Sequence, residues 1–299
     1  MPGRALGFAV LAAGVAVVSF ASILVRLAHA EGAPSLAIAA VRLGVAALAL
    51  APFAWTRAGR ELAALRGRNL VLCLASGLLL AAHFWAWITS LEYTSVASST
   101  ALVTTNPLWV ALASALLLRE RPAPGTVAGL ALTAAGSVLV FAADAGGDAP
   151  SRDSHALGNA LAVLGAVTAS GYLLAGRALR ARISLVAYVW AAYATAAVVL
   201  LLVAGAGGVP FASLPASAWL LMAALGLGPQ LVGHTALNWA LRRLSASFVA
   251  VAILGEPVGA ALLAWICFGE GFGALQFCGF VLLLAGIFMA ARAERGQAA

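Results

Sequence analysis

The chain has 299 residues, of which 64% are hydrophobic and only 9% are charged. Soluble globular proteins contain about 45–50% apolar and about 25% charged residues, so the composition excludes a soluble globular protein and indicates a polytopic membrane protein. The net charge of +7 does not indicate nucleic-acid binding, because the arginines lie between apolar runs and never along one helix face.

Ten apolar segments follow one another along the chain, each close to the ~20 residues that cross a bilayer as an α-helix. Their long unbroken apolar runs favour helices over barrel strands, which would alternate polar and apolar residues. The sequence therefore predicts an all-α polytopic membrane protein with ten transmembrane helices. The predicted spans are residues 5–27, 34–56, 68–92, 94–117, 123–142, 155–180, 185–205, 215–242, 245–266 and 273–292.

Landmarks of the first half recur in the second half at a nearly constant offset, which identifies an internal repeat. Asn106-Pro107 in the fourth segment corresponds to Glu256-Pro257 in the ninth. Because the first segment has its own counterpart in the sixth, we expect it to belong to the mature fold and not to be a cleaved signal peptide. Further equivalent pairs are Gly7 and Gly158, Gly14 and Gly165, Arg26 and Arg177, Glu120 and Glu270, Gly129 and Gly279, and Gly136 and Gly286.

The repeat divides the chain into two five-helix halves, residues 1–142 and 155–299, joined by a linker at residues 143–154. The linker is polar, acidic and rich in Gly and Pro. Since five is odd, the second half enters the membrane from the opposite side, and the sequence predicts inverted repeats that form a basket-shaped bundle. This architecture usually places a substrate site near the bilayer midplane, between the halves.

The arginines predict the orientation of the chain in the membrane. When the connections between segments are assigned to alternating sides, nearly all arginines fall on one side, and only Arg26 and Arg152 fall on the other. The positive-inside rule then places both termini in the cytoplasm and the linker in the periplasm. We therefore expect a multi-pass protein of a bacterial-type inner (plasma) membrane.

The repeated motifs resemble the drug/metabolite transporter superfamily, in its ten-helix EamA-type branch. The resemblance lies in residues 93–99, in Asn106-Pro107, in residues 119–122 and in their second copies. Within the third segment, residues 83–87 are most similar to the YddG-like exporters of aromatic amino acids. The resemblance implies that helices 5 and 10 lie at the periphery and that helices 1, 3, 4, 6, 8 and 9 line a central cavity.

This resemblance implies a secondary transporter that exports small amphipathic metabolites, with aromatic amino acids as the expected substrates, by alternating access. A drug or other small-metabolite exporter of the same fold is the alternative, and a non-transporting membrane scaffold is disfavoured. The sequence contains no nucleophile–base pair, paired aspartates or zinc motif, which argues against an enzyme. It contains no phosphate-binding loop, and we expect no cofactor. The expected partners are a small-molecule substrate and the lipid bilayer; the oligomeric state does not follow from the sequence.

The candidate substrate-binding residues are polar or aromatic side chains within the predicted helices. Glu256 is the only carboxylate deep in a helix, and it is expected to bind a substrate ammonium group or a proton, or to be neutral and bonded to another helix. Arg42 also lies within a span, and a carboxylate or a backbone carbonyl is its expected partner. The remaining candidates are His83 and Trp87 on one face of the third helix, Ser98, Asn106 and Trp109 on the fourth, Tyr172 on the sixth, and Gln230, His234 and Asn238 on the eighth.

Two prolines are candidate hinges. Pro107 and Pro257 occupy equivalent positions near the middle of the fourth and ninth helices. Each removes one backbone donor and leaves the carbonyl four residues earlier without its helical partner. The alternatives are a tolerated kink and a hinge for alternating access. The His and Cys residues lack the spacing of a metal site, so none is predicted.

Overall fold

The computed structural model describes residues 2–94, 96–113, 116, 124–144, 152–244, 246–268 and 273–296. These residues are almost entirely helical, and no strand occurs among them. The first half contains α1 (Pro2–Val18), α2 (Ala21–Ala30), α3 (Ser35–Ala63), α4 (Gly67–Tyr93), α5 (Val96–Val103), α6 (Asn106–Ala113) and α7 (Pro124–Asp144). The predicted linker falls mainly outside the described residues.

The remaining helices form the second half. It contains α8 (Arg152–Arg180), α9 (Leu185–Ala206), the short 3₁₀ helix η2 (Phe211–Ser213), α10 (Ala216–Leu225), the π-helical segment η3 (Gly226–His234), α11 (Thr235–Ala240), α12 (Ala246–Ile253), α13 (Gly255–Phe268) and α14 (Ala274–Gly296). Each predicted span therefore overlaps one helix or a series of two or three helical segments.

Within the described residues, length and composition identify six helical stretches that can cross a membrane. They coincide with the first, second, third, sixth, seventh and eighth predicted spans. Shorter apolar helices occur where the fifth, ninth and tenth spans were predicted. The six stretches are Leu6–Ala30, Ser35–Ala63, Gly67–Tyr93, Ala156–Arg180, Leu185–Ala206 and Ala216–Ala240.

The first, fourth, eighth and ninth predicted spans are interrupted. The prolines indicated a kink or a hinge in the fourth and ninth spans, whereas no interruption was predicted in the first and eighth. Between α1 and α2, the Ser19 hydroxyl donates to the Val15 carbonyl at 2.9 Å, and this type of local bond bends helices. Pro229 lies within η3, where its missing N–H is accommodated by the wider π-helical turn.

The fourth and ninth spans break just before their prolines. Between α5 and α6, the Thr105 N–H bonds to the Leu102 carbonyl at 3.1 Å, and between α12 and α13 the Leu254 N–H bonds to the Val251 carbonyl at 3.1 Å. Both are bonds to the third preceding residue, which tighten the chain where a proline cannot continue the helical ladder. The breaks fall at equivalent positions of the two halves.

Helix contacts pair the two halves with each other. Helix α3 packs on α9, α6 on α12 and α7 on α14, so these three contacts join equivalent predicted spans. Helix α4 packs on α8, and α1 packs on η3 and α11. The first of these contacts joins the third and sixth predicted spans, and the second joins the first and eighth. Because the third span is equivalent to the eighth and the first to the sixth, the two contacts are equivalent. The packing is therefore symmetric between the two copies of the repeat.

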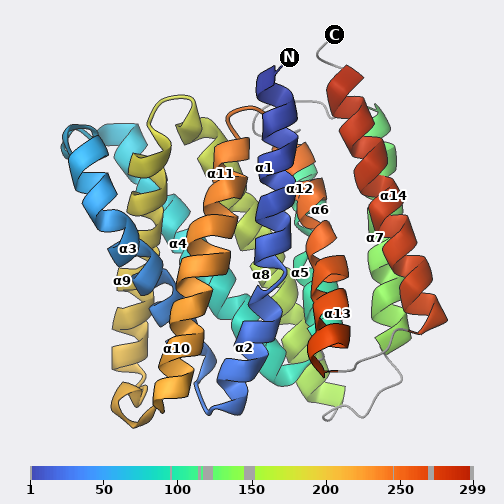
Figure 1. The fold of residues 1–299 in the computed structure, drawn as a ribbon, viewed down its shortest axis with the longest axis horizontal. Coiled ribbons are helices and arrows are strands. Elements are labelled where there is room, and N and C mark those ends of the chain that lie inside the picture. Colours follow the sequence, from blue (N-terminus) through green and yellow to red (C-terminus); the bar gives the residue numbers. More distant parts are fainter. Residues whose placement is uncertain are drawn as a thin grey trace.

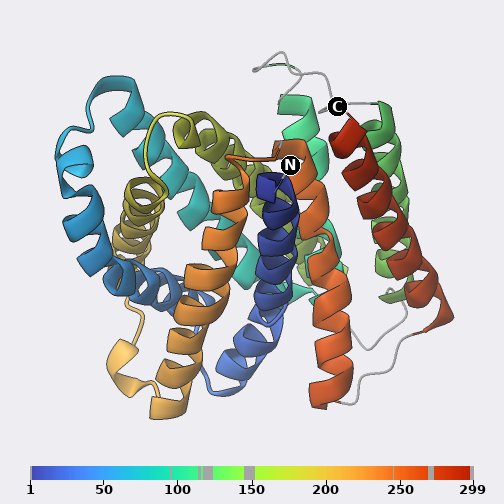
Figure 2. The same cartoon turned by 45° about the horizontal axis from the view of Figure 1, so that its top comes forward.

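Helices α7 and α14 lie side by side at one edge of the molecule in both views (Figures 1 and 2). The backbones approach closely there: a Cβ added to Gly286 would lie 2.5 Å from the Gly129 carbonyl oxygen. Small residues permit such packing in lipid, where no hydrophobic drive brings helices together. The resemblance predicted this peripheral position for the fifth and tenth helices.

The described chain ends lie at one end of the molecule. In Figure 1 the start of α1 and the end of α14 lie at the top, together with the connections from α3 to α4 and from α8 to α9. The connections from α2 to α3 and from α9 to α10 lie at the opposite end. Arginine-bearing connections thus share one end with both termini.

Candidate substrate cavity

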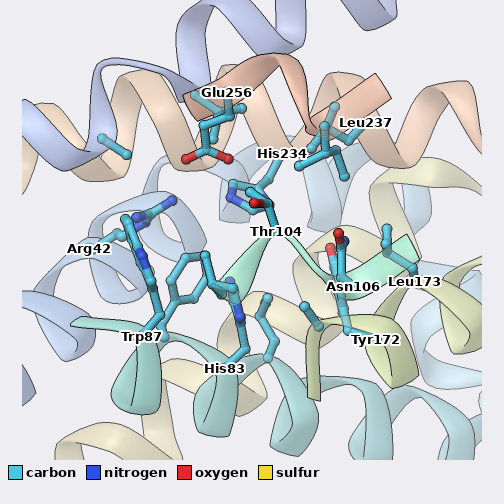
Figure 3. Close-up of a pocket in the computed structure, with 17 residues that line it drawn as sticks. Arg42, His83, Trp87, Thr104, Asn106, Tyr172, Leu173, His234, Leu237 and Glu256 are labelled. Carbon is cyan, nitrogen blue, oxygen red and sulfur yellow. The ribbon is translucent and has the colours of Figure 1, made fainter. Parts of the chain in front are cut away.

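A cavity lies within the bundle and, with the open space at its mouth, encloses about 650 Å³ (Figure 3). Helices from both halves contribute to it. The lining residues are Val18, Ala21, Arg42, Leu80, His83, Phe84, Trp87, Val103, Thr104, Asn106, Ala169, Tyr172, Leu173, His234, Leu237, Ile253 and Glu256.

The interruptions of the four broken spans lie at this cavity. Val18 and Ala21 flank the break between α1 and α2, Thr104 lies in the break before α6, and Ile253 precedes the break before α13. His234 is the last residue of η3. Non-helical backbone at membrane depth is tolerated where it faces protein or a cavity instead of lipid. The broken helices therefore position the cavity lining.

Aromatic rings of α4 form one wall. The His83 and Trp87 rings are parallel, with centroids 6.4 Å apart, so these two residues share a face as their spacing predicted. Phe84 packs against His83 at 4.6 Å and edge-on against His234 at 5.3 Å. The His83 Nδ1 donates to the Gly165 carbonyl of α8 at 3.0 Å. The wall is thus held by contacts with the second half.

Arg42 of α3 is an unexpected member of the cavity. Its side chain is fully buried, its Nε donates to Gln230 Oε1 at 2.8 Å, and its guanidinium carbon lies 4.0 Å from the centroid of the Phe84 ring. Its hydrogen-bond partner is an amide side chain from η3, which was not predicted, whereas a carboxylate, that of Glu256, interacts with Arg42 electrostatically. The two terminal guanidinium nitrogens have no hydrogen-bond partner within the part of the chain that the structure describes.

Glu256 and Asn106 occupy equivalent positions, and both face the cavity. The Glu256 carboxyl group points into it from the start of α13 (Figure 3). The Asn106 side chain is 4% exposed, and its Oδ1 has no hydrogen-bond partner among the described residues. The cavity therefore contains acceptor groups from both halves as well as the Arg42 donor.

Tyr172 and Asn238 join α8 to α11. The Asn238 amide donates to the Tyr172 hydroxyl and to the His234 carbonyl at 2.8 Å. Tyr172 and His234 line the cavity, whereas Asn238 lies behind them. Gln230 is also buried outside the lining, where it holds Arg42.

Six of the predicted binding residues therefore line the cavity, namely His83, Trp87, Asn106, Tyr172, His234 and Glu256. Gln230 and Asn238 stand behind the lining. Trp109 is half-buried outside the lining, and its Nε1 donates to Thr105 Oγ1 at 3.4 Å. The side chains of Ser98 and Pro107 lie outside what the structure describes, and Pro257 is buried directly after Glu256.

Arg42, Phe84 and Thr104 were absent from the predicted binding residues although they line the cavity. Arg42 carried a usable signal: it is an arginine well inside an apolar span, where an ionisable group is costly and usually functional. Phe84 and Thr104 gave no such signal, because both residue types are common in membrane helices.

Interrupted helices around a cavity of aromatic, charged and amide side chains define a class of polytopic membrane protein built to hold a small molecule within the bundle. The EamA-like transporter family matches residues 6–142 and again residues 156–292. The chain belongs to this family, which indicates a small-molecule membrane transporter. The two matches cover the two predicted halves.

A chain of known crystal structure has the same fold. It superposes with a TM-score of 0.78 at 20% sequence identity, and the match covers 98% of this chain and 99% of that chain. At this identity the likeness establishes the fold and not the substrate. A search of curated proteins found no significant match.

Proposed function

We propose that this protein is a secondary transporter that exports small amphipathic metabolites, with aromatic amino acids as its substrates. The observation that carries the proposal is a single cavity in which the aromatic rings of His83, Phe84 and Trp87 lie together with the charged groups of Arg42 and Glu256. An aromatic amino acid needs a flat apolar surface for its ring and polar groups for its ammonium and carboxylate.

The transport mechanism that we propose is alternating access by movement of two inverted five-helix repeats, residues 1–142 and 155–299. The symmetric contacts between equivalent helices support this, as do the matched breaks before Pro107 and Pro257. Inverted repeats give a transporter matched moving parts on both sides of its substrate site. In this mechanism the two prolines act as hinges.

The proposed location is an inner membrane of bacterial type, with both termini in the cytoplasm and residues 143–154 in the periplasm. The arginine-rich connections and the two chain ends lie at the same end of the bundle (Figure 1), which supports this orientation.

A drug exporter of the same fold is the second candidate. Glu256 beside aromatic rings suits an organic cation, because the face of an aromatic ring attracts positive charge. The buried guanidinium of Arg42 in the same cavity acts against a ligand that carries only positive charge. This opposition favours a zwitterion over a simple cation.

Transport in proteoliposomes tests the proposal. Vesicles that contain the purified protein should move radiolabelled phenylalanine, tryptophan and tyrosine faster than empty vesicles, and unlabelled competitors should rank aromatic amino acids above quaternary ammonium drugs, sugars and aliphatic polar solutes. Stronger competition by quaternary ammonium compounds would favour the drug exporter, and selective transport of a sugar or nucleotide sugar would reject the aromatic substrate.

A further inference from the structure

The Arg42 guanidinium is held in place on one side and unpaired on the other. Gln230 accepts from Nε at 2.8 Å, and the ring of Phe84 lies 4.0 Å from the guanidinium carbon. The terminal nitrogens Nη1 and Nη2 are buried and have no hydrogen-bond partner among the residues that the structure describes. Leaving such donors unpaired within a protein is costly.

Other unpaired polar atoms belong to the same cavity. The Trp87 indole Nε1 is buried without a hydrogen-bond partner in the described part of the chain, and the ring of Trp87 lies 6.0 Å from the guanidinium carbon of Arg42. Glu256 makes no hydrogen bond to the terminal nitrogens, which have none among the described residues, although the opposite charges of Arg42 and Glu256 attract each other. The donors are therefore available to a molecule that enters the cavity.

We propose that Arg42, with the indole N–H of Trp87, forms the anion-binding part of the cavity and receives the carboxylate of the transported molecule. This assignment rests on the proposed function, because it gives the transported amino acid its orientation. The two terminal nitrogens of a guanidinium lie in one plane and match the two oxygens of a carboxylate. Because Nε already donates to Gln230, the carboxylate binds to Nη1 and Nη2.

Gln230 and Phe84 position this site without contacting the ligand's charge. The amide oxygen of Gln230 fixes the rotation of the guanidinium plane, and Phe84 supports its face. Glu256, which lines the same cavity (Figure 3), provides a negative charge for the ligand's ammonium group. A ligand that carries both charges at one end and a ring at the other can contact the donors of Arg42, the carboxylate of Glu256 and the aromatic wall.

Ligands that differ in one charged group test the proposal on the unaltered protein. Binding of phenylalanine, phenylalaninamide, phenethylamine and 3-phenylpropionate is measured by calorimetry on the purified full-length chain. Loss of a charge-assisted hydrogen bond should weaken binding roughly 10-fold or more, so phenylalanine should bind at least that much more tightly than its amide. Equal affinity for the acid and the amide would overturn the anion site.

Variants assign the preference to Arg42. The ratio of acid to amide affinity should fall toward one in Arg42→Gln and take an intermediate value in Arg42→Lys, which keeps the charge but loses the planar fork. Arg57→Gln is the matched control, because Arg57 is an exposed arginine on the same helix; its ratio should equal that of the parent. A parental ratio in Arg42→Gln would overturn the proposal. If that variant does not fold, the ligand series on the unaltered protein decides.

Trp87→Phe gives an independent measurement. It keeps a ring but removes the indole donor, so the acid-to-amide ratio should fall. An unchanged ratio would remove Trp87 from the site. Tighter binding of phenyl phosphate than of 3-phenylpropionate would overturn the assignment to a carboxylate.

Failure of the anion site can be distinguished from failure of the proposed substrate class. If phenylalanine is transported but its amide binds equally well, the anion site is wrong and the transport proposal stands. If no aromatic compound binds, leucine and hexanoate are compared with leucinamide and hexylamine. An Arg42-dependent preference for those carboxylates would support the anion site and reject the aromatic substrate, whereas its absence would overturn the anion site as well.

Discussion

The Ser19 hydroxyl donates to the backbone carbonyl of Glu256 at 3.4 Å, and this contact has a counterpart in the other half of the molecule. There the Ser170 hydroxyl donates to the Asn106 carbonyl at 3.0 Å. Ser19 precedes α2 and Ser170 lies in the corresponding helix α8, so each serine joins a broken helix of the opposite half. The two contacts lie beside the cavity and connect the parts that the proposed alternating access would separate.

Removing either serine contact should shift the balance between the two access states. A typical intramolecular hydrogen bond contributes about 0.5–1.5 kcal/mol, so Ser19→Ala or Ser170→Ala should change the ratio of states by roughly 2- to 10-fold. Transport rates from the two faces, measured in oriented vesicles, should change unequally. Ser137→Ala in α7 is the control, because that hydroxyl donates to the Thr133 carbonyl of its own helix. Equal changes at both faces would contradict this role.

Replacing either hinge proline should slow transport. An alanine restores the missing N–H, which allows the helix to close the break and favours one access state. Pro107→Ala and Pro257→Ala should therefore lower the transport rate several-fold, while calorimetry shows binding close to the parental affinity.

Pro52→Ala serves as the control for the proline variants. Pro52 also lies inside a helix, α3, but not at the cavity. Parental transport by both hinge variants would show that Pro107 and Pro257 are ordinary kinks.

Glu256→Gln separates two roles of the cavity carboxylate. If Glu256 pairs with the substrate ammonium group, the change should weaken phenylalanine binding roughly 10-fold at every pH, with a smaller effect on 3-phenylpropionate, which has no amine. We expect this outcome because the equivalent residue, Asn106, carries no charge. Loss of the pH dependence of transport, with exchange of substrate for substrate retained, would instead identify a proton-coupling site.

Much of the fold could be predicted because hydropathy is a local property of the chain, and the membrane-spanning stretches lie where the apolar runs are. The face shared by His83 and Trp87 was also predictable, since α4 is a regular helix. The stripe of Gln230, His234 and Asn238 was only partly correct. Residues 226–234 form a π-helical segment, whose wider turn changes the direction of the side chains along it.

The hydrogen-bond partner of Arg42 could not be predicted from the sequence. Gln230 is remote from Arg42 in the chain, and the contact between α3 and η3 that brings them together is set by packing. Helical spacing assigns residues to a face of their own helix but does not say which helix that face meets. The sequence signal at Arg42 was the free-energy cost of placing an ionisable side chain at membrane depth. That cost implies a functional role but does not identify the residue that Arg42 contacts.

The orientation of the chain is tested by labelling the predicted linker. A cysteine introduced at Gly147, a position outside the described residues, should react with an impermeant thiol reagent from outside intact cells. The native cysteines Cys73, Cys267 and Cys278 are replaced first, and a cysteine at the exposed Arg57 provides the cytoplasmic control. Labelling of Gly147→Cys only after the membrane is opened would contradict cytoplasmic termini.

The aromatic wall should determine which substrates are carried. Contact between rings contributes about 0.5–1.5 kcal/mol beyond the burial of area, and Trp87 and His83 present parallel rings at the cavity. Because nothing in this wall selects one ring, phenylalanine, tyrosine and tryptophan should all be carried, and aliphatic polar solutes poorly.

Trp87→Ala and His83→Ala should each reduce transport of all three aromatic amino acids several-fold. Trp55→Ala is the control, since Trp55 is 70% exposed on α3, and its transport should equal that of the parent. Equal losses in all three variants, in proportion to lower protein levels, would instead identify His83 and Trp87 as packing residues.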